Sequence, residues 1–273
     1  MKLFASLVYQ KPSIAPSRLA TDDLYNTMTT KLNLRYNSMI TRIPAAARHA
    51  ADHGWLKTKL LFSFADYYDP ANMHFGALRV FNDDSIAPHN GFSEHEHDNM
   101  EIVTIMLEGE LTHRDSLGNT EVIKAGEVQQ MSAGSGITHA EMNESDKPVR
   151  LYQLWIFPSA LSLPTQYGQK DFSKKQKNAL VPVASGEGKA GALPMQCDAT
   201  VYLAELESGA SANHTIRPDR GTFVYVTKGS ITINGTTFEA GDQARIISET
   251  QITISATENA TCVLTDVPLI DGE

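Results

Sequence analysis

The most informative segment of the chain runs from Gly91 to Glu141. It opens with Gly-Phe-Ser-Glu-His-Glu-His, ending at His97, and closes with Gly-Ile-Thr-His-Ala-Glu, ending at Glu141. Side chains two residues apart in a β-strand point to the same face of the sheet. If the two strands are neighbours, four side chains meet at one point: His95, His97, His139 and Glu141. Three imidazoles and one carboxylate predict a metal site with open positions for water or substrate.

The sequence around these motifs has the pattern of short strands separated by turns. The run from Ile102 to Leu107 is apolar at successive positions, which indicates a strand buried on both faces. Leu117-Gly-Asn119 and Lys124-Ala-Gly126 are typical turn sequences. Many short strands with regular turns predict an all-β sandwich or barrel.

The chain also repeats one β unit. The run Thr104–Gly109, followed by Ala125-Gly-Glu127, is echoed by Val224–Gly229 and Ala240-Gly-Asp242. The segment between the copies, from Leu163 to Gln196, is polar and rich in lysine, glycine and proline, as expected of a linker.

The second copy lacks the ligand residues. Counting from the glycine turns places four residues at the positions of the metal motif: Thr215, Arg217, Ile254 and Ala256. None of these side chains replaces an imidazole or a carboxylate as a metal ligand. The second copy is therefore predicted to be structural.

Composition limits the class of protein. The 273 residues are 41% hydrophobic and 20% charged, which suits a packed globular protein. A net charge of -9 disfavours direct contact with nucleic acid. The sequence contains no run of about 20 apolar residues, so no membrane-spanning helix is predicted. Two cysteines, Cys197 and Cys262, are too few for a disulfide framework, and by default we expect a cytoplasmic location.

The motifs resemble those of the pirin family, a branch of the cupins. The matching segments are His95-Glu-His97, Met100–Gly109, His113–Asn119, Met131–Glu141 and Gln153–Ile156. Two further segments resemble bacterial members with quercetinase activity: His53-Gly-Trp55 and Phe62–Pro70. With the internal repeat, the resemblance implies an all-β bicupin of two jelly-roll barrels. The expected division is an extension (1–38), a metal-binding cupin domain (39–165), a linker (166–196) and a C-terminal cupin domain without metal ligands (197–273).

The resemblance also implies roles for individual residues. General cupins take a glutamate ligand from the first motif, where Glu101 stands, whereas the pirin pattern gives that role to Glu141. Glu141 is then both a metal ligand and the catalytic base. His53 and His74 are the further histidines expected to line the pocket, with Trp155 as a candidate wall.

The implied activity is cleavage of a flavonol such as quercetin by dioxygen. The expected cofactor is one divalent transition metal, Fe(II) first, while ligand identity leaves Ni, Cu, Mn and Zn open. The competing interpretation is a metal-binding regulatory protein that docks on a protein partner, as a transcription cofactor or an enzyme modulator. A cupin isomerase or epimerase is a third class, which the motif does not support.

Overall fold

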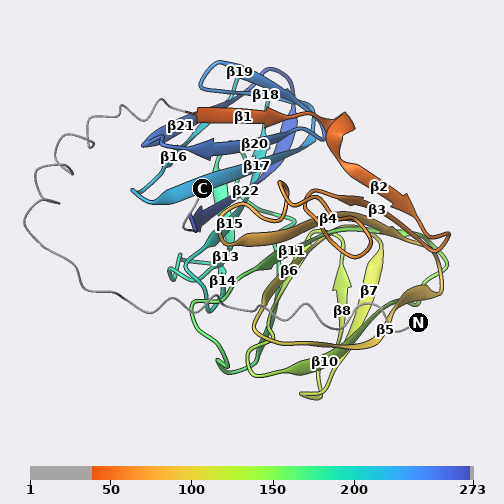
Figure 1. Ribbon diagram of the computed structural model, residues 1–273. Helices are drawn as coiled ribbons and strands as arrows, with labels where there is room; N and C mark the ends of the chain where they lie inside the picture. The colour runs from red at the N-terminus through yellow and green to blue at the C-terminus, as the bar shows by residue number, and fades with distance from the viewer. Residues whose placement is uncertain (1–38, 271–273) are drawn as a thin grey trace, which may run out of the picture.

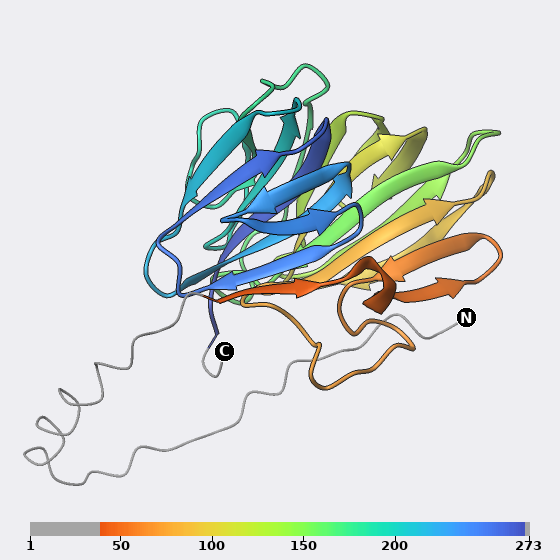
Figure 2. The same ribbon diagram turned by 90° about the horizontal axis from the view of Figure 1, so that it is seen from above.

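The computed structural model describes residues 39–270, and this part of the chain is built from strands. Strands β1 to β22 form four sheets, and the one helical element within these residues is the short 3-10 turn η1 (Ala45–Ala47). Figures 1 and 2 show two barrels side by side. The predicted all-β bicupin fold is confirmed, while the predicted extension 1–38 lies outside the described residues. No helix in residues 39–270 has the length and apolar character to cross a membrane.

The first barrel packs a seven-stranded sheet against a four-stranded sheet. Their strand orders are β12-β9-β6-β11-β4-β3-β2 and β5-β10-β7-β8. The strands are β2 (His49–Asp52), β3 (Leu56–Leu60), β4 (Leu78–Ile86), β5 (Asn90–His97), β6 (Glu101–Glu108), β7 (Glu110–Asp115), β8 (Thr120–Lys124), β9 (Glu127–Ser132), β10 (Ile137–Asn143), β11 (Val149–Ile156) and β12 (Gln166–Asp171).

The second barrel repeats this plan. Its sheets have the orders β1-β20-β17-β22-β15-β13-β14 and β16-β21-β18-β19. The strands are β1 (Met39–Ile43), β13 (Leu180–Ser185), β14 (Leu193–Pro194), β15 (Thr200–Leu206), β16 (Ser211–Thr215), β17 (Arg220–Lys228), β18 (Ser230–Ile233), β19 (Thr236–Glu239), β20 (Gln243–Ile247), β21 (Gln251–Ala256) and β22 (Ala260–Pro268).

Strand β6 is apolar at successive positions because both of its faces are buried. Ile102 and Met106 belong to apolar clusters inside the first barrel. Val103 and Ile105 belong to the cluster that lies between the two barrels. Each such side chain contributes about 1.5–3 kcal/mol by burial. The prediction of a strand covered on both sides is confirmed.

The two seven-stranded sheets face each other across a shared core. The ring of Phe81 lies 5.8 Å from Phe223 and 5.0 Å from Tyr225, measured between centroids. The Tyr225 hydroxyl donates to Asp83 Oδ2 at 3.1 Å, and Arg48 Nη1 lies 3.7 Å from the same oxygen. Apolar packing and a buried polar contact therefore both hold the first barrel against the second.

Strand β1 and the predicted linker 166–196 both form strands of the two barrels, which their positions in the sequence did not suggest. Strand β1 pairs with β20, from Met39 opposite Ile247 to Ile43 opposite Gln243, and so forms an edge of the second barrel. The predicted linker 166–196 contains β12, β13 and β14. Of these, β12 pairs with β9 of the first barrel, and β13 with β15 of the second. The linker is not irregular, because the sheet ladders satisfy its backbone groups. The domain limits at 165 and 197 stay a prediction.

Strand register corrects the alignment of the two barrels. His214 stands opposite Ile252 on neighbouring strands, as His95 stands opposite His139. The positions of the metal motif are therefore filled by His214, Ile216, Ile252 and Ile254; of the residues that counting suggested, only Ile254 stays in the set, at the position of Glu141 and not of His139. Counting failed because the connection before β17 is longer than the one before β6, and the connection before β21 is shorter than the one before β10.

Candidate metal centre

The two strands that carry the metal motif are neighbours in the four-stranded sheet. Strands β5 and β10 run antiparallel, with His95 opposite His139 and His97 opposite Ile137. Burial alternates along β10, so that Ile137, His139 and Glu141 all face the inside of the barrel. The period of two residues thus places all four predicted ligands on one face of two adjacent strands.

A glycine allows the strands to approach where the register shifts. The ladder between β5 and β10 is irregular between His139 and Glu141. A Cβ atom on Gly91 would lie 2.2 Å from the carbonyl oxygen of Glu141. A larger residue at position 91 would therefore push β5 away from the strand that carries His139 and Glu141.

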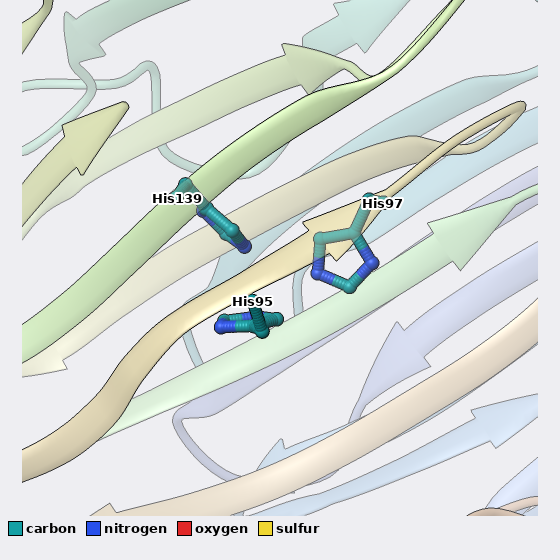
Figure 3. A group of neighbouring side chains, drawn as sticks. All are labelled: His95, His97 and His139. Atoms are coloured by element: carbon teal, nitrogen blue, oxygen red, sulfur yellow. The ribbon is translucent and has the colours of Figure 1, made fainter. Parts of the chain in front are cut away.

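Three imidazoles converge at this place. Ring centroids lie 4.4 Å apart for His95 and His139, 4.8 Å for His95 and His97, and 4.9 Å for His97 and His139. One nitrogen from each ring lies within 4.8 Å of the others. Figure 3 shows His139 pointing from its strand toward the strand that carries His95 and His97. This arrangement matches the spacing of side chains around one metal ion.

Glu141 belongs to a second, overlapping group. Its carboxylate lies within 4.8 Å of nitrogen atoms of His139 and His113, the latter on β7. Glu141 stands directly opposite His113 in the ladder of β10 and β7. His139 is shared by both groups and so links Glu141 to His95 and His97, but the four residues do not form a single group at this distance.

Both nitrogens of His113 are already occupied. Its Nε2 lies 2.9 Å from Asp115 Oδ2, and its Nδ1 lies 3.0 Å from Gln129 Nε2. The amide of Gln129 donates, so Nδ1 accepts and Nε2 carries the proton that binds Asp115. His113 therefore supports the site rather than offering a lone pair to an ion. Sequence reasoning missed this contact, because no local pattern pairs β7 with β10.

Several buried atoms at the centre have no hydrogen-bond partner. His139 and Glu141 are each only 2% exposed. Both ring nitrogens of His139 and Oε1 of Glu141 make no hydrogen bond within the described chain. Leaving a buried polar group unpaired costs about 1–3 kcal/mol, and native proteins seldom do so. Imidazole and carboxylate donors of this kind fit a divalent transition metal.

The surroundings keep His97 and His139 neutral. Burial lowers the pKa of His139 to about 3, and the neighbouring rings of His95 and His113 lower it further. Burial likewise lowers the pKa of His97 to about 3, with contributions from His139 and His95. A neutral imidazole has the free lone pair that metal binding requires. The site is therefore prepared for a cation at neutral pH.

A chain of hydrogen bonds orients the carboxylate. Gln153 Nε2 donates to Glu141 Oε2 at 2.9 Å, and Trp155 Nε1 donates to Gln153 Oε1 at 3.1 Å. One oxygen of Glu141 is thus held while the other is left free. Gln153 and Trp155 are two residues apart and point to the same face of β11. The period of two residues could have revealed this pair in the sequence.

Aromatic rings line one side of the centre. Trp155 lies 4.8 Å from His97 and 5.1 Å from Phe64 between ring centroids. The predicted pocket residue His74 packs against Phe157 at 6.3 Å, and His53 is exposed. Among the described residues neither joins a group able to hold a metal.

Glu101 makes its contacts elsewhere. This buried side chain accepts hydrogen bonds at Oε2 from Gln130 Nε2 at 2.9 Å and Ser132 Oγ at 2.8 Å. The backbone N–H of Gln196 donates to the same oxygen at 3.1 Å. Burial raises the pKa of Glu101, and these three hydrogen bonds oppose the shift. Its role is to tie β6 to β9 and to the segment that leads into the second barrel.

Known families match both barrels. The family described as Pirin matches residues 43–156, and the family described as Quercetinase C-terminal cupin domain matches residues 182–267. The two matches together cover the strands of the metal centre and most of the second barrel.

Relatives match the chain over most of its length. A Pirin-like protein of Caulobacter vibrioides is 46% identical over 230 residues, which are 84% of this chain and 99% of the relative. A Quercetin 2,3-dioxygenase of Escherichia coli K12 is 41% identical over 231 residues, or 84% of this chain and 99% of that protein. The crystal structure of the bacterial pirin YhhW from Escherichia coli in complex with nickel(II) is 40% identical with a TM-score of 0.81. It covers 85% of this chain and 100% of that one.

Proposed function

This chain belongs to the pirin family, and from that premise we propose that it is a metal-dependent dioxygenase of the quercetin 2,3-dioxygenase type. The substrate is a flavonol or a related aromatic enol, and dioxygen is the second substrate. The observation that carries the proposal is the group of His95, His97 and His139, in which both nitrogens of the buried His139 lack a hydrogen-bond partner next to Glu141. Relatives named quercetin 2,3-dioxygenase, one of them 41% identical, support the choice of reaction.

The proposed cofactor is one divalent transition metal, with Fe(II) as the first candidate. The proposed ligands are the three histidines of the cluster and Glu141. Nickel(II) is the ion in the related Escherichia coli structure, and the same ligand types also suit Cu, Mn and Zn. Such a metal supplies an open coordination position beside the substrate oxygen and, where it is redox-active, access to dioxygen chemistry.

Glu141 has the position of a general base. Its Oε2 is held by Gln153, whereas its Oε1 is buried and without a hydrogen-bond partner. A flavonol hydroxyl that enters the site meets this oxygen as its proton acceptor. General base catalysis contributes typically about 10²–10⁴-fold to a rate. Gln153 holds the carboxylate in the orientation that the transfer needs.

The aromatic side of the site fits an aromatic substrate. Trp155 and Phe64 present ring surfaces beside His97. Aromatic pairs of this kind contribute about 0.5–1.5 kcal/mol beyond the burial of their area. The indole N–H of Trp155 also reaches Glu141 indirectly, through its hydrogen bond to Gln153.

The deciding experiment is dioxygen uptake with quercetin. The full chain is purified without a histidine tag, stripped of metal and reloaded in parallel with Fe(II), Ni(II) or Cu(II). We expect quercetin-dependent uptake with at least one metal, and none in the stripped protein or in a His139→Ala variant. If no metal supports turnover while one ion still binds per chain, the dioxygenase proposal is wrong. The metal-binding regulatory interpretation then takes its place.

A further inference from the structure

A cavity of about 240 Å³ lies at the seam between the two barrels, and none of the residues that line it belongs to the metal centre. Its walls come from the end of β1 with η1, from β20, and from the connection between β3 and β4. Its polar lining residues are Tyr67, Asp69, Asn72, Gln243 and Arg245. Pockets for drug-sized ligands measure about 300–1,000 Å³, so this cavity suits a smaller molecule.

The connection between β3 and β4 is held in shape by its own hydrogen bonds. The Ser63 hydroxyl donates to the carbonyl oxygen of Asp69 at 2.9 Å and accepts from the N–H of Asp69 at 2.8 Å. Phe64 and Tyr67 exchange two backbone hydrogen bonds of 3.0 Å. The ring of Tyr67 stacks on His49, with 4.4 Å between centroids. This wall of the cavity is therefore formed before any ligand arrives, which lowers the cost of binding.

Gln243 lines the cavity with donors that the protein does not use. The side chain is buried, with 1% of its surface exposed. Its Oε1 lies 3.5 Å from Arg245 Nη2, while its N–H₂ group makes no hydrogen bond within the described part of the chain. Buried polar groups rarely lack a partner in native proteins. The two N–H donors of Gln243 are therefore left for the contents of the cavity.

Tyr67 and Arg245 add a donor and a positive charge. The Tyr67 hydroxyl accepts from Asn72 Nδ2 at 3.4 Å, so its own O–H remains available as a donor. Arg245 Nη2 donates to Asn72 Oδ1 at 2.6 Å, and its guanidinium lies 4.8 Å above the ring of Phe62. These contacts fix the plane of a group that stays charged at any physiological pH. Donors gathered around a guanidinium suit a carboxylate ligand.

Asp69 gives the cavity a negative charge on a different wall. Its Oδ1 accepts a hydrogen bond from the N–H of Ala71 at 3.0 Å. Within the described residues Asp69 forms no ion pair, with Arg245 or with any other cation. A ligand that carried a negative charge alone would be repelled by this carboxylate, and an amine alone would be repelled by Arg245. The lining therefore selects a molecule with one charge of each sign.

We propose that the seam between the barrels is a binding site for a small zwitterion of the amino-acid class. The carboxylate of the ligand binds Arg245, Gln243 and Tyr67. Its ammonium group binds Asp69. The site is separate from the metal centre, so the proposal stands or falls independently of the dioxygenase function.

Binding of single amino acids to the metal-loaded full chain tests the site. The probes are alanine, serine, aspartate and glutamate, measured by titration calorimetry. Each is paired with the carboxylic acid that lacks the amine and the amine that lacks the carboxylate; for alanine these are propionate and ethylamine. We expect at least one amino acid to bind one-to-one, with both of its analogues at least tenfold weaker, since each analogue lacks one charge-assisted contact. If no amino acid binds, or an analogue binds equally well, the proposal is wrong.

The metal requires its own control, because amino acids also chelate metal ions. The titrations are repeated on the full chain after the metal has been removed. Binding at the seam should keep its affinity without the metal. Binding that disappears with the metal belongs to the metal centre and would overturn the proposal.

Substitutions in the lining assign each contact. Arg245→Gln removes the charge but keeps an amide donor for Asn72, and should weaken binding at least tenfold. Asp69→Asn keeps the acceptor for Ala71 and should abolish the preference for an amino acid over its carboxylic-acid analogue. Tyr67→Phe keeps the stacked ring and should weaken binding severalfold.

Arg42→Gln is the matched control for the loss of an arginine. Arg42 lies on β1, next to β20, where it binds Asp242 and does not line the cavity. This variant should bind the amino acid like wild type. Wild-type affinity in Arg245→Gln, or an equal loss in Arg42→Gln, would contradict the assignment. If Arg245→Gln fails to fold, Asp69→Asn and Tyr67→Phe still decide, because they keep the size of the side chain.

Discussion

The first and second barrels have the same strands in the same order, yet their interiors differ in chemistry. At matching positions the first barrel has His139 and Glu141, and the second has Ile252 and Ile254. The isoleucines are fully buried in an apolar cluster, whereas the polar pair has atoms without protein partners. Burying an isoleucine stabilises a fold by about 1.5–3 kcal/mol. The second barrel therefore has the apolar residues that stabilise these buried positions. The polar residues of the first barrel are therefore best explained by function.

The interface shows how the two barrels depend on each other. Phe81 and Asp83 of the first barrel contact Tyr225 of the second through ring packing and a hydrogen bond. Inside the first barrel, two small apolar clusters share the interior with unpaired polar atoms. The larger apolar cluster lies between the barrels, so the first barrel is expected to rely on its contact with the second. The comparison thus predicts opposite responses to equivalent substitutions in the two barrels.

The largest contrast is expected at the position shared by His139 and Ile252. His139→Ala should weaken metal binding by at least about 100-fold, since a ligand matters no less than the groups that support it. Ile252→Ala should leave one metal per chain but lower the free energy of unfolding by about 2–5 kcal/mol, because it opens a cavity. Elemental analysis and thermal unfolding of both variants check this. Two tightly held metals per wild-type chain would contradict the contrast.

Glu141 and Glu101 provide the next comparison, between two buried glutamates of one barrel. Glu141→Gln should lower metal affinity by roughly 10–100-fold and turnover at saturating metal by about 10²-fold or more. Glu101→Gln should change either quantity much less, because its contacts lie away from the cluster. Quercetin-dependent oxygen uptake on the metal-saturated proteins measures turnover, and titration calorimetry with the metal measures affinity. Equal turnover of wild type and Glu141→Gln would show that Glu141 is no base.

The next comparison is between Asp84, which titrates, and its counterpart Ala204 in the second barrel, which does not. We expect Asp84 to make the stability of the protein depend on pH. The pKa of Asp84 is raised to about 7 in the fold, so the native state holds a proton that the unfolded chain releases at lower pH. The free energy of unfolding of the metal-free protein should therefore decrease as the pH rises from about 4 to 7. This group contributes at most about 1.4 kcal/mol per pH unit to that decrease. Above that range the contribution is constant. Denaturant unfolding of wild type and Asp84→Asn should show this slope only in wild type.

The smallest expected effect is at Gln153, which corresponds to Leu264 in the second barrel. Gln153→Leu removes the hydrogen bond to Glu141 Oε2 and should weaken metal binding roughly tenfold. Leu264→Gln places an amide in the apolar core and should only destabilise the protein. Titration calorimetry with the chosen metal measures the first change, and thermal unfolding the second. Unchanged affinity in Gln153→Leu would show that Glu141 needs no such support.

The convergence of the three histidines could be predicted because its signal is local, while their role as metal ligands stays a prediction. A period of two residues and the two motifs place His95, His97 and His139 on inward faces once the strands pair. The contact of Glu141 with His113 could not be predicted, since it depends on how β7 pairs with β10. Register between distant strands is set by loop lengths and ladder bonds, which also explains why His214 stands where counting suggested Thr215.

The pairing of β1 with β20 constrains how the chain reaches its fold. Arg42 on β1 binds Asp242, 200 residues further along the chain. At about 5–20 residues per second, a newly made β1 waits roughly 10–40 s on the ribosome before its partner exists. During that time the whole first barrel is synthesised, while β1 has no ladder to join. Contacts of such long range slow folding, so closure of the second barrel is expected to be the last and slowest step.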